Sequence, residues 1–296
     1  MRKRNFVKDG LKKLYKVIPF KKQIFSGIKR IILPGRSITS HLYFNGAFKV
    51  KCQADSFRMR HFGAQVENIV FWYGLENGFE KESVKIWMRL CKNANNIFDI
   101  GSNTGLYSLI AKTINPNAQV FAFEPIKRIV DKLKYNIELN NYDIHVVEKA
   151  LSNRNGTAVI YDYEIEHAYS ATLNENFTFS QRGSVETQVE TIMLDSFIEL
   201  NNLSGIDLLK IDVETHEPEV LEGFLKNLQL YKPTLLIEIL NDEVGNRVYE
   251  LVKNLDYMYF NINENGTIKK QDMITRSEHT NFLFCNRGIA QRIGLI

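Results

Sequence analysis

The sequence contains few cysteines and no long apolar run. The three cysteines, Cys52, Cys91 and Cys285, are odd in number and far apart, which excludes a disulfide framework and a cysteine metal site and favours a reducing compartment. No apolar run approaches the length of a membrane-spanning helix, and the basic N-terminus lacks the apolar core and small-residue cleavage site of a signal peptide. We therefore expect a cytoplasmic protein. Its 296 residues, 44% of them hydrophobic, suffice for one large core or two smaller ones.

The positive charge of the chain is concentrated at its N-terminus. Residues 1–30 hold eleven Lys and Arg residues and one acid, so they carry +10, and the other 266 residues carry −6 because the whole chain carries +4. Apolar residues recur here at helical spacing, which predicts a basic amphipathic arm over residues 1–35. Such an arm can lie on the inner face of an anionic membrane, or it can pack its apolar stripe on the main body. We expect no nucleic-acid partner, because the rest of the chain is acidic.

Two kinds of pattern follow the arm. Apolar and polar residues alternate over residues 41–62, which predicts antiparallel strands with one solvated face. Apolar residues then recur at helical spacing over residues 80–91, which predicts a helix. We therefore assign residues 36–92 to a small lead-in made of a β-hairpin and a helix, and residues 93–296 to the main domain.

Short apolar runs alternate with amphipathic segments in the main domain. The predicted strands are 97–100, 119–123, 145–148, 207–213, 234–239, 257–262 and 281–285, and the predicted helices are 106–113, 128–139, 217–227 and 246–255. This order predicts an α/β fold with a doubly wound, mostly parallel sheet and helices on both faces. Residues 164–184 are polar and lack a period, so we expect a long loop over one face there.

The stretch NIFDIGSNTGLYSL, residues 96–109, reads as a strand, a loop with two glycines and the start of a helix. In a doubly wound sheet the ligand lies beyond the carboxyl ends of the strands, next to the first such turn. Gly101 and Gly105 would let that ligand approach the backbone, since a Cβ at either position would crowd it. Glu124 ends the second strand, 23 residues after Gly101, where it can accept hydrogen bonds from two ribose hydroxyls. The pattern therefore favours a nucleoside.

The charge of the ligand decides between two nucleoside cofactors. A nicotinamide dinucleotide carries a pyrophosphate, which is normally held by a Gly-x-Gly-x-x-Gly loop. Here Ser102 or Asn103 replaces the middle glycine, and the carboxylate of Asp99 would repel a pyrophosphate. S-adenosylmethionine carries a ribose, an ammonium and a sulfonium but no phosphate, so it fits better. A nicotinamide-dependent dehydrogenase and a non-catalytic nucleotide-binding scaffold are the alternatives.

Residues 78–239 resemble the FkbM-type methyltransferases. The resemblance rests on the linked segments DIGSNTGLYSL, FAFEP, ALSNRNG, VETIMLDSF, LLKIDVETHEPEVLEG and PTLLIEI. It implies a class I, Rossmann-like methyltransferase fold and S-adenosylmethionine as the cofactor, and we expect an antiparallel strand at the edge of the sheet. Thr215 departs from the family, which usually has glycine there, so a left-handed turn at Thr215 would be strained. The cofactor-binding residues that the resemblance implies are Asp99, Gly101, Asn103 and Gly105 for the methionine and sugar portion, Glu124 for the ribose and Ala150 at the adenine edge.

The segment KIDVETHEPE, residues 210–219, is where we place the acceptor chemistry. Methyl transfer from a sulfonium is an in-line displacement, and a hydroxyl acceptor must also lose its proton, so a base or a metal is expected near the methyl group. The candidate catalytic residues are Lys210, Asp212, Glu214 and His216.

Two of these residues have specific expected roles. His216 is the candidate general base, with a surface position in the first helical turn as the alternative, and Lys210 is the expected partner of one acid. A divalent metal held by Asp212, Glu214 or Glu238 is an alternative that we do not favour. The sequence therefore predicts an O-methyltransferase that acts on a hydroxyl of a small molecule or glycan, with a sugar as the first choice.

Overall fold

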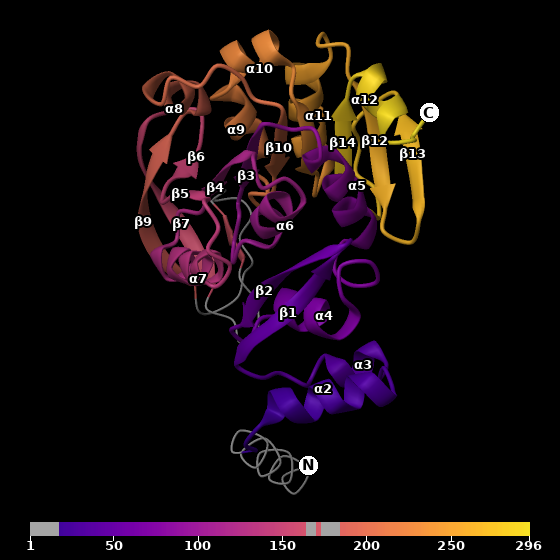
Figure 1. Ribbon diagram of the computed structural model, residues 1–296. Coiled ribbons are helices and arrows are strands. Elements are labelled where there is room, and N and C mark those ends of the chain that lie inside the picture. The colour runs from indigo at the N-terminus through magenta and orange to yellow at the C-terminus, as the bar shows by residue number, and fades with distance from the viewer. Residues whose placement is uncertain (1–17, 164–169, 173–183) are drawn as a thin grey trace, which may run out of the picture.

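The computed structural model describes residues 18–163, 170–172 and 184–296, so the first half of the predicted arm and much of the predicted loop lie outside the described residues. Figure 1 shows a large sheet with helices on both faces in the upper part of the molecule. A smaller sheet stands beside it, and a hairpin with short helices forms the lower end.

In the described part of the chain, eight strands form the large sheet, in the order β13, β12, β14, β11, β10, β3, β4, β5. The five strands from β11 to β5 are parallel, whereas β14 runs antiparallel to its neighbours β11 and β12. β13 is antiparallel to β12 and forms the edge. The predicted mostly parallel sheet with an antiparallel edge strand is confirmed. The strand bounds are Asn96–Ile100 for β3, Gln119–Phe123 for β4, His145–Val147 for β5, Leu208–Ile211 for β10, Thr234–Glu238 for β11, Met258–Asn263 for β12, Thr267–Gln271 for β13 and Asn281–Cys285 for β14.

Alternate side chains of the central strands enter two separate cores. Ile97 and Leu208 join one core, whereas their neighbours Phe98 and Leu209 join the other, because successive residues of a strand point to opposite faces. Helices cover both faces, which explains why these strands are apolar throughout rather than alternating. On the first face lie α5 (Lys81–Cys91), α6 (Leu106–Ile114), α7 (Lys127–Glu138) and α12 (Arg287–Arg292), and on the second α8 (Leu194–Leu200), α9 (Glu217–Glu222), α10 (Leu225–Tyr231) and α11 (Asp242–Val252).

The lead-in contains the predicted hairpin, formed by β1 (Gly46–Cys52) and β2 (Asp55–His61), and a further helix, α4 (Gln65–Tyr73). Apolar residues of all three elements join the core on the first face of the large sheet. The side chain of Asn136 on α7 accepts a hydrogen bond from the Arg60 amide at 2.8 Å, which occupies the outer edge of β2. The lead-in is therefore fixed to the helices that cover the sheet.

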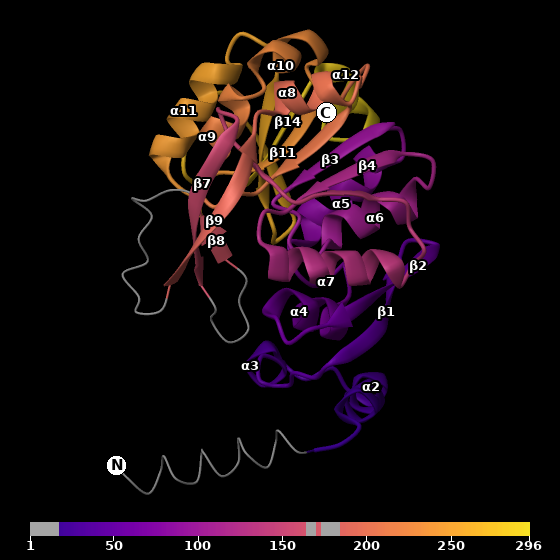
Figure 2. The same ribbon diagram turned by 90° about the vertical axis from the view of Figure 1, so that its left-hand side faces the viewer.

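The smaller sheet was not predicted from the sequence. Its order is β6 (Ala150–Leu151), β9 (Ser184–Ile192), β7 (Gly156–Tyr163) and β8 (Ser170–Thr172), and Figure 2 shows it beside the large sheet. β8 pairs with β7 and lies inside residues 164–184, so the predicted loop is wrong at residues 170–172. The rest of that range, apart from Ser184 at the start of β9, lies outside the described residues.

The helix predicted over residues 217–227 is two helices, α9 and α10, which Gly223 separates. A Cβ on Gly223 would lie 2.1 Å from the carbonyl oxygen of Ser152. The chain turns here because the backbone of the neighbouring strand approaches α9 too closely for a side chain. This contact also places the end of α9 against Ser152, which follows the strand β6.

Candidate functional site

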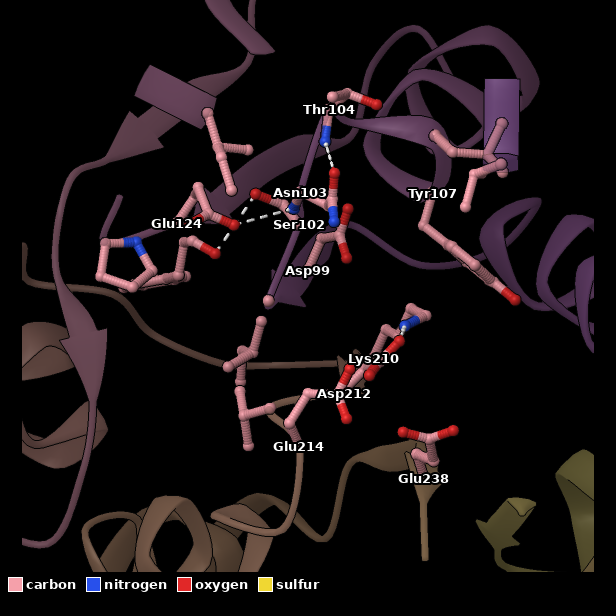
Figure 3. A pocket seen from close by; sticks show the side chains of 18 of the residues that line it. Asp99, Ser102, Asn103, Thr104, Tyr107, Glu124, Lys210, Asp212, Glu214 and Glu238 are labelled. Atoms are coloured by element: carbon pink, nitrogen blue, oxygen red, sulfur yellow. Dashed lines mark hydrogen bonds and ion pairs between the residues drawn. The ribbon is translucent and has the colours of Figure 1, made fainter. Parts of the chain in front are cut away.

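A cavity of about 420 Å³ lies at the carboxyl ends of β3, β4, β10 and β11. Residues 64–66 at the start of α4 and residues 79–80 before α5 close another side of it. In Figure 3, Asp99, Asn103 and Glu124 lie on one side of the pocket and Lys210, Asp212, Glu214 and Glu238 on the other. Of the predicted site residues, those that line the cavity are Asp99, Gly101, Asn103, Glu124, Ala150, Lys210, Asp212, Glu214 and His216. Gly105 is not among the lining residues.

Both loop glycines are required by contacts within the protein itself. Gly101 has φ +77°, and a Cβ there would lie 1.8 Å from the carbonyl oxygen of Asp212. Gly105 has φ +93°, and a Cβ there would lie 2.5 Å from the Leu133 side chain. The expectation that a Cβ at these positions would crowd a ligand stays a prediction, and these contacts add a second reason for the glycines. The glycines let the loop fold tightly between β10 and α7.

Asp99 is a buried carboxylate with one oxygen unsatisfied. Its side chain accepts a hydrogen bond from the Ser108 hydroxyl at 2.6 Å through Oδ2, while Oδ1 has no partner. Burial raises the pKa of Asp99, and the positive charge of Lys210 only partly offsets this effect. A buried acceptor without a donor is costly, so this position favours a ligand that brings a donor or a positive charge.

Glu124 is held at the tip of β4 by two backbone amides. Asn103 N donates to its Oε2 at 3.1 Å and Ile126 N donates to its Oε1 at 3.0 Å. Asn103 has a left-handed backbone with φ +50°, and this conformation belongs to the turn that aims its amide at the carboxylate in Figure 3. A carboxylate offers about four acceptor sites, which is more than these two amides use.

A charged network forms the opposite side of the cavity. Lys210 Nζ lies 2.6 Å from Asp212 Oδ2 and 4.6 Å from the centre of the Tyr107 ring. The Tyr107 hydroxyl donates to Glu80 Oε2 at 2.6 Å. Although burial opposes the charge of Lys210, the acids Asp212, Glu80 and Asp99 hold its pKa above the usual value. The expected pairing of Lys210 with an acid is present, and Glu80, which precedes α5, is a site residue that sequence reasoning missed.

Glu238 ends β11 beside this network. Its Oε1 accepts a hydrogen bond from the Thr280 hydroxyl at 3.0 Å. Burial and the negative charges of Asp212 and Glu214 raise the pKa of Glu238 to about 10. Among the residues that the structure describes, no group of three or more His, Cys, Asp and Glu side chains is arranged to hold a metal ion.

His216 faces a different neighbourhood from these acids. Its Nε2 lies 3.1 Å from the Ser152 hydroxyl, and its Nδ1 lies 3.5 Å from Glu219 Oε2. Burial lowers the pKa of His216, while Glu219 acts in the opposite direction. The other charged groups that act on its pKa are Arg247, Glu222 and Arg154 rather than the acids of the opposite wall. His216 thus lies beside the segment where the adenine edge is expected.

The turn between β10 and α9 has a left-handed backbone, with φ +55° at Glu214 and +78° at Thr215. Glu217 Oε1 accepts hydrogen bonds from Val213 N at 3.1 Å and Thr215 N at 3.3 Å, so this buried acid holds the turn closed. Burial raises the pKa of Glu217 to about 8. Thr215 therefore occupies a left-handed conformation that glycine, the usual residue of the family at this position, adopts without strain.

The family comparison agrees with this geometry. The sequence model of the family described as "Methyltransferase FkbM domain" matches residues 99–262, more than half of the chain and nearly all of the cavity's strand tips. The chain belongs to the FkbM methyltransferase family. Its matched region begins at Asp99 and includes Glu124, Lys210, Asp212 and Glu238.

Three related proteins show how far this similarity extends. Hexuronic acid methyltransferase AglP from Haloferax volcanii is 29% identical over 150 residues, which are 51% of this chain and 58% of AglP. Methyltransferase sdnD from Sordaria araneosa is 30% identical over 157 residues, 43% of this chain and 59% of sdnD. The chain thus spans under two thirds of these curated relatives. The crystal structure of an FkbM methyltransferase from Methylobacillus flagellatus KT covers 65% of this chain and 44% of its own, with 13% identity and a TM-score of 0.40, which is too distant to add to the assignment.

Proposed function

We propose that this FkbM family member is an S-adenosylmethionine-dependent O-methyltransferase that acts on a hydroxyl of a small molecule or glycan, with a sugar as the favoured acceptor. The observation that carries the proposal is the pair of carboxylates at the tips of β3 and β4. Asp99 has a buried oxygen without a donor, and Glu124 is aimed by two amides into the same cavity. A ligand with a positive charge and a ribose diol satisfies both.

The cofactor residues have separate tasks in this proposal. S-adenosylmethionine supplies the activated methyl group when it is bound. Glu124 accepts hydrogen bonds from the ribose hydroxyls, because a carboxylate offers more acceptor sites than the amides of Asn103 and Ile126 use. Asp99 provides a negative charge in a buried place, which favours a cationic ligand over a pyrophosphate. A nicotinamide dinucleotide is disfavoured for the same reason.

The acceptor residues lie on the opposite wall. Lys210 and Asp212 form an ion pair that can position an acceptor hydroxyl by donating and accepting hydrogen bonds, with Glu214 next to them. Glu238 has a raised pKa, so its carboxylate form binds a proton strongly and can take the proton of the acceptor hydroxyl. We therefore favour Glu238 as the base, while the base role of His216 stays a prediction.

The charge of this wall also bears on the acceptor class. Among the described residues, the acids Glu80, Asp212, Glu214 and Glu238 line this wall together with Lys210, while Lys149 lines the cavity beside Ala150. An acceptor that carries its own carboxylate would meet repulsion from those of these acids that are ionised. Although the relative AglP is named a hexuronic acid methyltransferase, we propose an uncharged sugar hydroxyl for this chain.

Transfer of a labelled methyl group from S-adenosylmethionine tests the proposal. The full chain is incubated with matched neutral sugars and hexuronic acids, free and as glycosides, and the products are analysed by mass spectrometry. We expect methyl ethers on a neutral sugar, with turnover reduced at least about tenfold in Asp212→Asn. Binding of the cofactor without transfer to any hydroxylated acceptor would instead favour the non-catalytic scaffold, and selective methylation of hexuronic acids would contradict the acceptor class.

A further inference from the structure

Helix α2 (Lys21–Ile31), α3 (Arg36–Thr39) and the residues next to them carry several exposed large apolar side chains that are close together in the sequence. Ile31 is 89% exposed, Phe20 72% and Ile32 64%. Exposed apolar residues that lie singly are ordinary, but a cluster of them marks an interaction surface. We define the α2–α3 apolar surface as Phe20, Ile24, Ile31, Ile32, Leu33 and Ile38, all of which are exposed.

A different side of α2 is firmly packed on the lead-in. The Phe25 ring is buried, with its centroid 5.7 Å from that of Trp72 and 6.3 Å from that of Phe44. Lys29 donates a hydrogen bond to the carbonyl of Phe71. Ile24 and Ile31 are seven residues apart, so they share a side of the helix about 100° away from Phe25. The apolar surface is therefore presented by a fixed helix.

Positive charges flank this surface. The helical spacing places Lys21 and Arg30 on either side of the row formed by Ile24 and Ile31. Arg36 on α3 lies over the Tyr73 ring instead. Residues 1–30 also carry eleven of the 38 Lys and Arg residues and a single acid. An apolar row bordered by Lys and Arg is typical of a helix that lies in the headgroup region of an anionic bilayer.

We propose that the α2–α3 apolar surface docks this protein on an anionic lipid bilayer, with its aliphatic side chains at the headgroup level and the flanking cations on the lipid phosphates. None of the helices in the described ranges is long and apolar enough to cross a membrane, so the contact would be peripheral. Figures 1 and 2 both show α2 and α3 at the end of the molecule opposite α10. Docking there leaves both sheets clear of the lipid.

Vesicle sedimentation with the full chain tests the proposal. We expect the protein to sediment with vesicles of phosphatidylcholine and phosphatidylglycerol, to remain in the supernatant with phosphatidylcholine alone, and to bind less as salt is raised. The double variant Ile31→Ser/Ile32→Ser should reduce the partition coefficient at least about tenfold, because two apolar side chains no longer enter the lipid. Leu200→Ser/Leu230→Ser is the matched control, since these side chains are 73% and 66% exposed on α8 and α10.

Three results would overturn the proposal. The first is a wild-type chain that stays in the supernatant with anionic vesicles. The second is equal sedimentation of the two double variants, which would assign binding to another part of the chain. The third comes from light scattering without lipid: a dimer that Ile31→Ser/Ile32→Ser converts to a monomer would identify the surface as an interface between two copies.

Discussion

At the residue scale, the cavity holds two candidates for the base that accepts the proton of the substrate hydroxyl. Burial and neighbouring acids raise the pKa of Glu238 to about 10, whereas burial lowers the pKa of His216 below 6.5. A base works in its deprotonated form, so an activity that depends on Glu238 rises with pH above neutrality. An activity that depends on His216 would already have reached its maximum at neutral pH, because His216 is deprotonated below that pH.

We predict that kcat/KM of the wild-type chain increases with pH on a limb that lies above neutrality. Glu238→Gln should remove this limb and lower kcat by about 10²–10⁴-fold, because the amide cannot accept the proton. His216→Gln is the control and should keep the limb. The measurement is the initial rate of methyl transfer across the pH range at several acceptor concentrations. A limb that lies below pH 6.5 and disappears in His216→Gln would restore His216 as the base.

Nine of the ten site residues predicted from the sequence line the cavity, because the carboxyl ends of parallel strands meet at one edge of the sheet. Asp99, Glu124 and Asp212 lie at or just past such ends, so their meeting follows from the strand pattern. Glu80 was missed because it lies outside the parallel sheet, and its hydrogen bond to Tyr107 depends on how α5 packs. Glu80 and Tyr107 are 27 residues apart in the sequence, so no local sequence pattern indicates that they meet.

At the element scale, the turn from β10 to α9 combines strain with a specific support. Thr215 has φ +78°, a conformation that costs a β-branched residue about 1–3 kcal/mol. Glu217 offsets this strain by accepting hydrogen bonds from the amides of Val213 and Thr215. The absence of the family's glycine pointed to strain at Thr215. The hydrogen bonds to Glu217 could be recognised only in the folded turn.

We predict that Thr215→Gly increases the free energy of unfolding by about 1 kcal/mol, since relief of backbone strain exceeds the added flexibility of the unfolded glycine. Thr267→Gly is the control, because Thr267 is an exposed residue in the strand β13, and it should destabilise by about 0.5–1 kcal/mol. Urea unfolding followed by circular dichroism measures both. A less stable Thr215→Gly variant would mean that the contacts of the buried threonine side chain outweigh the strain.

Elements with a strong apolar period were predicted well, and elements with polar or broken patterns were not. The strand predicted over residues 119–123 has the observed bounds of β4, because its apolar run is continuous. The strands β7 and β9 carry polar residues on a solvated face, so they did not stand out. The helix predicted over residues 246–255 begins earlier, at Asp242, where the Asn241 side chain accepts a hydrogen bond from Val244 N at 2.9 Å.

At the scale of the whole molecule, the lead-in and the main sheet build the cavity together. Residues 64–66 and 79–80 of the lead-in line it along with the strand tips of the sheet. The two parts also share one core on the first face of the sheet. The sequence pattern changes near residue 92, but residues on both sides of this boundary line the cavity. Removal of residues 36–92 would therefore open the cavity.

The central claim is that this cavity binds S-adenosylmethionine through the carboxylates at the tips of β3 and β4, and calorimetric titration of the full chain tests it most directly. We predict one site per chain, with affinity reduced at least about tenfold in Glu124→Ala and unchanged in Glu76→Ala, an exposed glutamate. A titration without heat of binding, or equal affinities of the wild type and Glu124→Ala, would contradict the claim.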